Sequence, residues 1–225
     1  YITGSGSLSV TSNFADAIVG KDDLSILGGT IAVTSVDDGI RGKDSLTITG
    51  GTITIDAAQD ALKSSNDTDA GKGVLTITGG QLTIRAGDDA IKAEQSLSIT
   101  GGTIDIQTSV EGIEAPVIVI DGGTITLNAS DDGINASASA IVTSGLSITI
   151  NGGDISITMG SGDTDAIDSN GDLTITGGTL NITAQSPFDY DGTGTLTGGT
   201  ITVNGESVTA LTNQMMGGGG GGGRP

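Results

Sequence analysis

The stretch DDGIRGKDSLTITGGTITI, residues 37–55, decides the fold, because residues 88–106 repeat its pattern as DDAIKAEQSLSITGGTIDI. A glycine pair between two short apolar runs marks each copy of this unit. The shortest intervals between pairs are 21 and 22 residues, and the two longest contain insertions near residues 64–73 and 135–145. Such regular self-similarity is typical of a solenoid. The pair recurs eight times, and its first glycine is Gly28, Gly50, Gly79, Gly101, Gly122, Gly152, Gly177 or Gly198.

Aliphatic residues form five columns when the units are aligned on the glycine pair, and one unit shows them as Ile40, Leu46, Ile48, Ile53 and Ile55. Polar residues alternate with them, which is typical of strands with one buried face. Five inward residues per unit form a core only when the units stack. The sequence therefore predicts an all-β fold, a single-stranded right-handed parallel β-helix of about eight rungs, each with two good strands and one short strand.

Two other solenoid or sheet folds fit less well. A leucine-rich repeat needs an Asn or Cys column and a helical segment, and both are missing here. An antiparallel sandwich does not require identical columns. We expect the β-helix to span residues 1–208, followed by a Gly-rich tail at 209–225 that is either a linker or a short cap on the last rung.

The composition excludes several classes of protein. The 225 residues include 27 acids, eight bases and no His or Cys, so the net charge is −19. A surface this negative repels phosphate backbones, so we expect no nucleic-acid partner. Without His or Cys there is neither a Ser-His-Asp nor a Cys-His catalytic system, nor an ordinary zinc site. No apolar run approaches the ~18 residues of a membrane span, and we expect a monomer.

One column is acidic, and it stands two residues before an inward aliphatic position. Because strict alternation would point both side chains inward, we expect a bend between them. Several units add a second acid just before the first. The column comprises Asp16, Asp38, Asp60, Asp89, Glu111, Asp132, Asp165 and Asp189, and the added acids are Asp37, Asp88 and Asp131, with Asp163 one position further back.

Stacking places equivalent carboxylates about 5 Å apart, where two like charges repel by roughly 3 kcal/mol at an effective dielectric of 20. Splaying into solvent, protonation or bridging cations would relieve this repulsion. Calcium is suited to the task because it accepts six to eight oxygens. The Gly or Ala after each acid is expected to leave backbone carbonyls accessible as further ligands. A solubilising polar face and Asx-turn roles are the alternatives.

The charge changes sign along the rod. Arg41, Lys63 and Lys92 can pair with nearby acids, and we also predict that they contact substrate, whereas residues after 92 include 15 acids and one base. Calcium is therefore expected first where acids lack counter-charges, with Asp88 and Asp89 as the second choice. Asp37, Asp38 and Asp60 complete the predicted metal ligands. The first-choice residues are Glu111, Glu114, Asp131, Asp132, Asp163, Asp165 and Asp168.

The repeated DDGI…SLTITGGTITI unit resembles calcium-binding β-helix carbohydrate-binding proteins of clostridia and related Gram-positive bacteria, over residues ~14–204. The resemblance implies a secreted or cell-surface protein that holds several calcium ions and binds acidic polysaccharide of plants or microbes, such as polygalacturonate or pectin, and also cellulose. The fold is similar to polysaccharide lyase family nine. Asp165 and Asp168 match part of that family's calcium motif, Thr164 replaces one Asp, and Asp132 is the candidate ligand from the neighbouring rung.

Two functions follow from these residues. The first is non-catalytic binding, in which uronate carboxylates complete the shell of surface calcium ions. The second is a lyase that performs β-elimination with Lys63 or Lys92 as the base. Binding is favoured, because most rungs lack the loops that would wall a cleft. With only four aromatic residues, stacking on neutral sugars such as cellulose is weakly supported.

Overall fold

The computed structural model describes residues 1–161 and 164–213, and within them the chain is built from strands that form three sheets. The long-strand sheet contains β1 (Ser7–Ser12), β4 (Thr30–Ser35), β7 (Thr52–Ala57), β10 (Gln81–Ala86), β13 (Thr103–Thr108), β16 (Thr124–Ala129), β19 (Asp154–Met159), β22 (Thr179–Thr183), β25 (Thr200–Val203) and β26 (Glu206–Val208). The short-strand sheet contains β2 (Ile18–Gly20), β5 (Ile40–Gly42), β8 (Leu62–Ser64), β11 (Ile91–Ala93), β14 (Ile113–Glu114), β17 (Ile134–Ala136), β20 (Asp165–Ser169) and β23 (Ser186–Tyr190). The third sheet contains β3 (Asp23–Ile26), β6 (Ser45–Ile48), β9 (Val74–Ile77), β12 (Ser96–Ile99), β15 (Val117–Ile120), β18 (Ser147–Ile150), β21 (Asp172–Ile175) and β24 (Gly194–Leu196).

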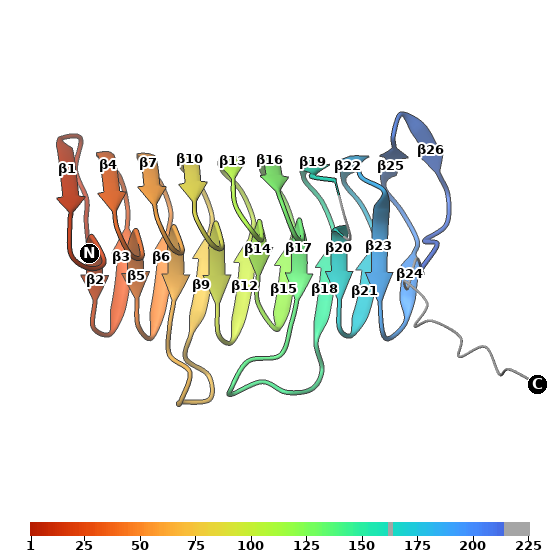
Figure 1. The fold of residues 1–225 in the computed structure, drawn as a ribbon, viewed down its shortest axis with the longest axis horizontal. Helices are drawn as coiled ribbons and strands as arrows, with labels where there is room; N and C mark the ends of the chain where they lie inside the picture. Colours follow the sequence, from red (N-terminus) through yellow and green to blue (C-terminus); the bar gives the residue numbers. More distant parts are fainter. Residues whose placement is uncertain (162–163, 214–225) are drawn as a thin grey trace, which may run out of the picture.

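Each coil of the chain contributes one strand to each sheet, and equivalent strands pair in parallel with the coil before and after (Figure 1). The register follows the predicted columns, since Ile48 pairs with Ile77 and Ile53 with Leu82. Eight complete coils run from β1 to β24, and β25 begins a ninth. The predicted parallel β-helix, with one short strand per coil, is confirmed.

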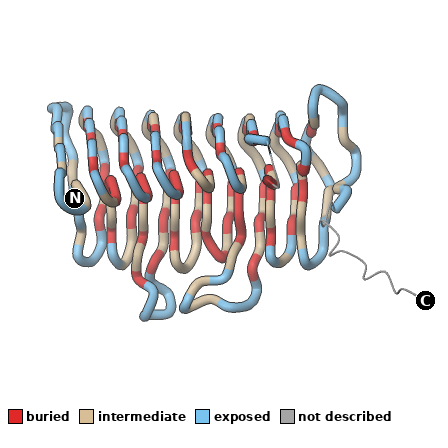
Figure 2. Tube along the Cα trace, in the orientation of Figure 1, coloured by how far each residue is buried: buried red, intermediate tan, exposed pale blue. Residues whose placement is uncertain are grey.

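The core lies inside the coils, where the aliphatic columns stack as continuous ladders (Figure 2). Ile48, Ile77, Ile99 and Ile120 are fully buried neighbours in one such ladder. Burying each side chain of this kind stabilises the fold by about 1.5–3 kcal/mol. Because each coil contributes to every ladder, the coils cannot fold independently of their neighbours.

The glycine pairs form the corners between the third sheet and the long-strand sheet. The second glycine of the pair has a positive φ, for example 100° at Gly51. A Cβ at Gly51 would also lie 2.9 Å from the carbonyl oxygen of Gly29 in the preceding coil. Both the backbone angle and the close stacking of coils therefore require glycine there.

Two loops protrude from the rod at residues 65–73 and 137–146, between β8 and β9 and between β17 and β18 (Figure 1). They match the two insertions that the spacing of the glycine pairs predicts. Asn66 holds the first loop, because its buried side chain accepts hydrogen bonds from the amides of Thr68 and Asp69 and donates one to Asp44. These contacts use local polar partners, so the loop leaves the stacked core unchanged.

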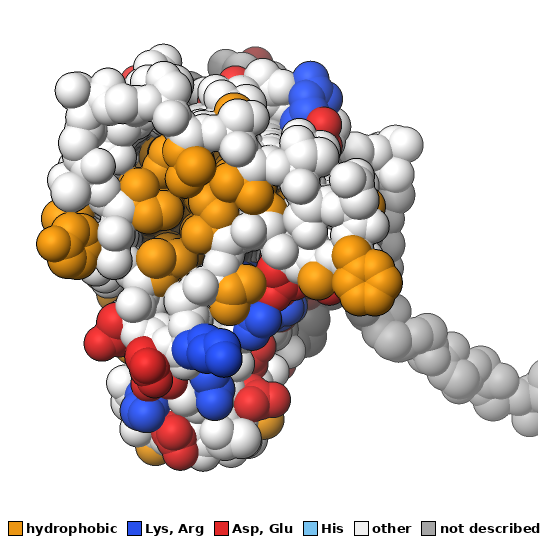
Figure 3. Space-filling view, turned by 90° about the vertical axis from the view of Figure 1, so that its left-hand side faces the viewer, with side chains coloured by type: hydrophobic (Ala, Val, Ile, Leu, Met, Phe, Trp, Pro, Cys, Tyr) orange, Lys and Arg blue, Asp and Glu red, His pale blue; other side chains and the backbone are white. Residues whose placement is uncertain are grey.

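The two ends of the rod differ. The first coil presents an apolar end face, with Leu8 40% exposed, above a group of acidic and basic side chains (Figure 3). At the other end β26 folds back antiparallel on β25, and Asn213 donates a hydrogen bond to the Tyr190 carbonyl. The residues that cover the last coil thus include the start of the predicted tail, whose remainder from 214 lies outside the described residues.

Candidate functional site

The acidic column lies at the corner between the long-strand and short-strand sheets, and we call it the acid corner. The chain bends there, since β4 ends at Ser35 and β5 begins at Ile40. This is the bend that the sequence requires. Asp60 and Asp89 are only 2% and 3% exposed, so the bend turns these carboxylates along the rod rather than out into solvent.

One carboxylate oxygen of several column acids is used to hold the coils together. The amide of Asp60 donates to Asp38 Oδ1 at 3.3 Å, and the amide of Asp89 donates to Asp60 Oδ1 at 3.0 Å. The amide of Asp165 donates to Asp132 Oδ1 at 3.1 Å. Each such acid therefore caps the backbone of the next coil, and the other oxygen of Asp38 and Asp60 contacts a basic side chain.

The small residue after each acid has a different role from the one expected. The amide of Gly39 donates to the Asp60 carbonyl at 2.8 Å, and the amide of Gly112 donates to the Asp132 carbonyl at 2.9 Å. A Cβ at Gly39 would lie 2.6 Å from the Ala61 carbonyl oxygen. The small residues permit close stacking, and the carbonyls of the acids are occupied by the ladder rather than left accessible.

Basic side chains neutralise the first part of the acid corner, by which we mean the coils that contain Arg41, Lys63 and Lys92. Arg41 contacts Asp16 Oδ2 at 2.5 Å, and Lys63 contacts Asp60 Oδ2 at 2.6 Å and Asp38 Oδ2 at 3.6 Å. Burial lowers the pKa of Lys63, but its hydrogen bond and charge interaction with Asp60 raise that pKa above its ordinary value. Burial raises the pKa of Asp38 to about 6, against the opposing charge of Lys63. The lysine ammonium thus occupies the space between two stacked carboxylates.

Lys92 repeats this arrangement one coil further on. Its ammonium contacts Asp89 Oδ2 at 2.6 Å and also contacts Glu114. Burial raises the pKa of Asp89, whereas hydrogen bonds from its neighbours, including Lys92 and Ser137, lower the pKa of Glu114 despite burial. Glu111 lies outside this pair, and burial together with the charge of Glu114 raises its pKa to about 7.

The second part of the acid corner consists of the coils that follow Glu114. It has no basic side chain among the described residues. In the ladder, Lys92 is followed by Glu114, Asn135 and Asp168. Burial and the charges of Asp132 and other nearby acids raise the pKa of Asp168 to about 7. Burial likewise raises the pKa of Asp132 to about 6. These carboxylates repel one another at neutral pH unless a cation from solution joins them.

Asn135 is the residue in this part whose importance the sequence did not reveal. It is 6% exposed, and its Nδ2 donates to Glu111 Oε2 at 3.1 Å. Its Oδ1 is buried without a hydrogen-bond partner in the part of the chain that the structure describes. A buried acceptor without a donor is costly, so this oxygen, between acids of neighbouring coils, fits a cation ligand. The sequence signal was the single amide in a column of charged residues.

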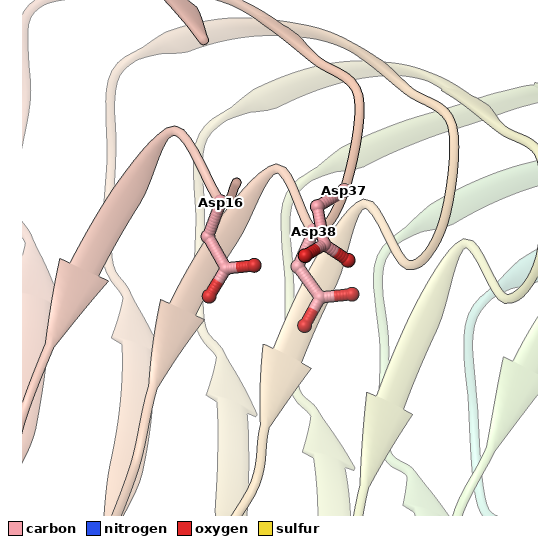
Figure 4. Close-up of side chains that lie close together, drawn as sticks. All are labelled: Asp16, Asp37 and Asp38. Atoms are coloured by element: carbon pink, nitrogen blue, oxygen red, sulfur yellow. The ribbon is translucent and has the colours of Figure 1, made fainter. Parts of the chain in front are cut away.

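Within residues 1–161 and 164–213, three groups of acids bring carboxylate oxygens within 4.8 Å of one another. Figure 4 shows the first group, in which Asp16 and the pair Asp37 and Asp38 come from neighbouring corners and lie side by side. In each of the other two groups, a lysine already contacts at least one of the acids. Asp131 is exposed, and Asp163 lies outside the described residues. The other groups are Asp60 with Asp88 and Asp89, and Asp89 with Glu111 and Glu114.

Comparison with known protein families gives one match. The model of a family described as carbohydrate-binding domain-containing protein matches residues 1–164 and 110–214, which together span nearly the whole β-helix. The chain belongs to this family. No curated protein and no solved structure gives a significant match. Among the described residues, no helix of this carbohydrate-binding domain is long and apolar enough to cross a membrane.

Proposed function

We propose that this domain binds acidic polysaccharide such as polygalacturonate or pectin, without catalysis and with calcium ions as the link. The observation that carries the proposal is the second part of the acid corner, where the carboxylates of Asp132 and Asp168 make no ion pair with a base among the described residues. In a domain that binds carbohydrate, such a surface needs divalent cations before an anionic polymer can approach. Calcium ions with open coordination positions would turn a repulsive surface into an adhesive one.

The donor set of the second part fits calcium. Carboxylates of Asp132, Asp165 and Asp168 and the amide oxygen of Asn135 are the hard oxygen ligands that calcium prefers. Asp165 also accepts a hydrogen bond from Ser186, which helps to orient its carboxylate. In the first part, Arg41 and Lys63 supply the positive charge within the protein itself. We therefore assign calcium first to the coils that follow Glu114, and extracellular location follows as a prediction from this use of calcium.

Polymer geometry supports an acidic rather than a neutral ligand. Stacked coils repeat the same carboxylate every ~4.8 Å, so bound ions would form a row that a repetitive polyuronate can follow. Neutral sugars are usually recognised by aromatic stacking, but Phe188 is 1% exposed and belongs to the core, and the exposed Tyr1 and Phe14 precede β2, away from the second part of the acid corner. Cellulose therefore has little support from the exposed side chains.

A lyase mechanism is disfavoured by the state of its candidate bases. A lysine base must be neutral to remove a proton. Lys63 and Lys92 each contact two carboxylates, and these contacts raise the pKa of both lysines above the ordinary value. Both side chains are thus held as ammonium ions inside the acid corner.

Retention on immobilised polygalacturonate tests the proposal. We expect retention in calcium, release by a chelator, and no formation of the unsaturated uronate product that absorbs in the ultraviolet. Asp168→Asn should reduce calcium-dependent retention, while Asp69→Asn, on the first protruding loop, serves as the control for loss of one charge. Retention that persists in chelator would contradict the role of calcium, and product formation would establish a lyase.

A further inference from the structure

The long-strand sheet contains one irregularity. Strands β10 and β13 are in regular register up to Ile84 and Ile106, but Arg85 then pairs with Thr108 instead of Gln107. Gln107 is therefore the extra residue of a β-bulge. Bulges redirect side chains and are frequent beside functional sites, so this position differs from every regular coil around it.

The surface beside this bulge is hollowed by about 400 Å³, a volume within the usual range for small-ligand sites. Its lining is partly apolar and otherwise formed by uncharged polar groups. Val110 lies where the neighbouring coils have the exposed acids Asp88 and Asp131, and its backbone hydrogen bonds to both of them. The lining side chains are Ala86, Val110 and Ala129, with Gln107, Thr108, Ser109, Asn128 and Ser130.

Polar groups at the hollow can recognise sugar hydroxyls. Gln107 Nε2 donates to Asp105 at 3.0 Å, and Asn128 Nδ2 donates to the Ile106 carbonyl at 3.3 Å. These bonds fix both amides and orient their oxygens as acceptors. The apolar side chains of Val110 and Ala129 offer a surface for the C–H groups of a sugar ring.

Arg85 supplies a positive charge next to this hollow. It is exposed, it is the ladder neighbour of Thr108, and it precedes Ala86 in the lining. Within the described residues Arg85 has no carboxylate within 4.0 Å, although Asp56 is its ladder neighbour on the other side. By contrast, Arg41, Lys63 and Lys92 are all engaged with acids of the acid corner. A free guanidinium is well suited to bind a carboxylate in a bidentate manner.

We propose that the hollow beside Arg85 is a subsite for one uronate residue of the bound polysaccharide. The Arg85 guanidinium binds the carboxylate of that sugar, and the amide oxygens of Gln107 and Asn128 accept hydrogen bonds from its hydroxyls. This subsite rests on the proposed function, since it requires an acidic sugar as ligand. Val110 makes the arrangement possible, because an acid at that position would repel the uronate.

Titration calorimetry with oligogalacturonate in excess calcium tests the subsite. Arg85→Met should weaken binding by about tenfold, as expected for the loss of a charge-assisted hydrogen bond. Lys43→Met removes an exposed base without an ion pair elsewhere and should bind as the wild type does. A neutral galactose oligomer should show no difference between Arg85→Met and wild type.

A second pair of variants adds one negative charge each, the first in the hollow and the second on a regular part of the long-strand sheet. Thr108→Asp should weaken oligogalacturonate binding, whereas Thr11→Asp, an exposed position on β1 far from the hollow, should not. Both residues are exposed, so thermal unfolding should match the wild type. If the wild type binds in calcium and all four variants match it, the subsite is wrong while the proposed function stands. If the wild type does not bind, the proposed function fails and the subsite fails with it.

Discussion

The two parts of the acid corner have the same backbone geometry but differ in their basic side chains. In the first part, Lys63 and Lys92 lie between stacked carboxylates, so the cation is covalently part of the chain. In the second part, Asn135 and Asp168 take the same ladder positions. The same repeat unit thus either neutralises its acids internally or leaves them open to a ligand, according to the residue type three positions after the column acid.

The largest effect on stability is expected from removing an internal cation. Lys92→Met leaves the buried carboxylate of Asp89 and that of Glu114 without their counter-charge, which should lower the free energy of unfolding by about 3 kcal/mol. Urea unfolding at neutral pH measures it. Lys72→Met is the matched control, because its side chain is 45% exposed and its ion pairs with Asp44 and Asp69 are on the surface. Its cost should be much smaller, because water screens ion pairs at the surface, and equal losses for both variants would contradict the distinction.

Converting the second part into a copy of the first should remove most of its stabilisation by calcium. Asp168→Lys recreates the spacing of Lys63 after Asp60, because Asp165 precedes position 168 by three residues. In chelator this variant should be more stable than the wild type, because an ammonium replaces a repelled carboxylate. Calcium at 100 times its dissociation constant should stabilise the wild type by about 2.7 kcal/mol, but the variant much less. Asp168→Asn is the control that removes the charge without adding a cation. If calcium stabilises Asp168→Lys as much as the wild type, calcium does not bind at this site.

The pH dependence of stability should also differ between calcium and chelator. The pKa values of Asp132, Glu111 and Asp168 are raised to about 6, 7 and 7 by burial and neighbouring acids. The folded state therefore holds protons that the unfolded chain releases near pH 4. In chelator, the contribution of these three acids to stability should be fully present below that value and be lost as the pH rises through about 7. Saturating calcium should remove much of this loss, whereas identical curves with and without calcium would contradict an ion at these acids.

The coil architecture could be predicted from sequence because each ladder position depends only on residue type and spacing. Ile40, Leu46, Ile48, Ile53 and Ile55 are all buried, as their columns indicate. The acid corner could be predicted for the same reason. The bulge at Gln107 could not, because strict alternation after Ile106 would place Thr108 inward, as Ala86 is after Ile84.

Contacts between coils underlie both that bulge and the hydrogen bonding of the Asn135 amide. The structure turns Thr108 outward, and Ser109 takes the inward place, where its hydroxyl donates to the Asn128 carbonyl at 3.4 Å. The partner of Asn135 depends on which carboxylate of another coil comes within reach. Both features arise from contacts between coils, which the spacing within one unit does not determine.

The smallest expected effect concerns the exposed second acids of the two parts. Asp88→Asn and Asp131→Asn should each change the free energy of unfolding by less than about 0.5 kcal/mol, because both side chains are at the surface. Their effects on retention by polygalacturonate in calcium should nevertheless differ. Asp131 adjoins Asp132, which has no base beside it, whereas Asp88 adjoins Asp89, which Lys92 already neutralises. Asp131→Asn should therefore weaken retention more than Asp88→Asn, and the reverse order would place the polymer on the lysine-neutralised coils.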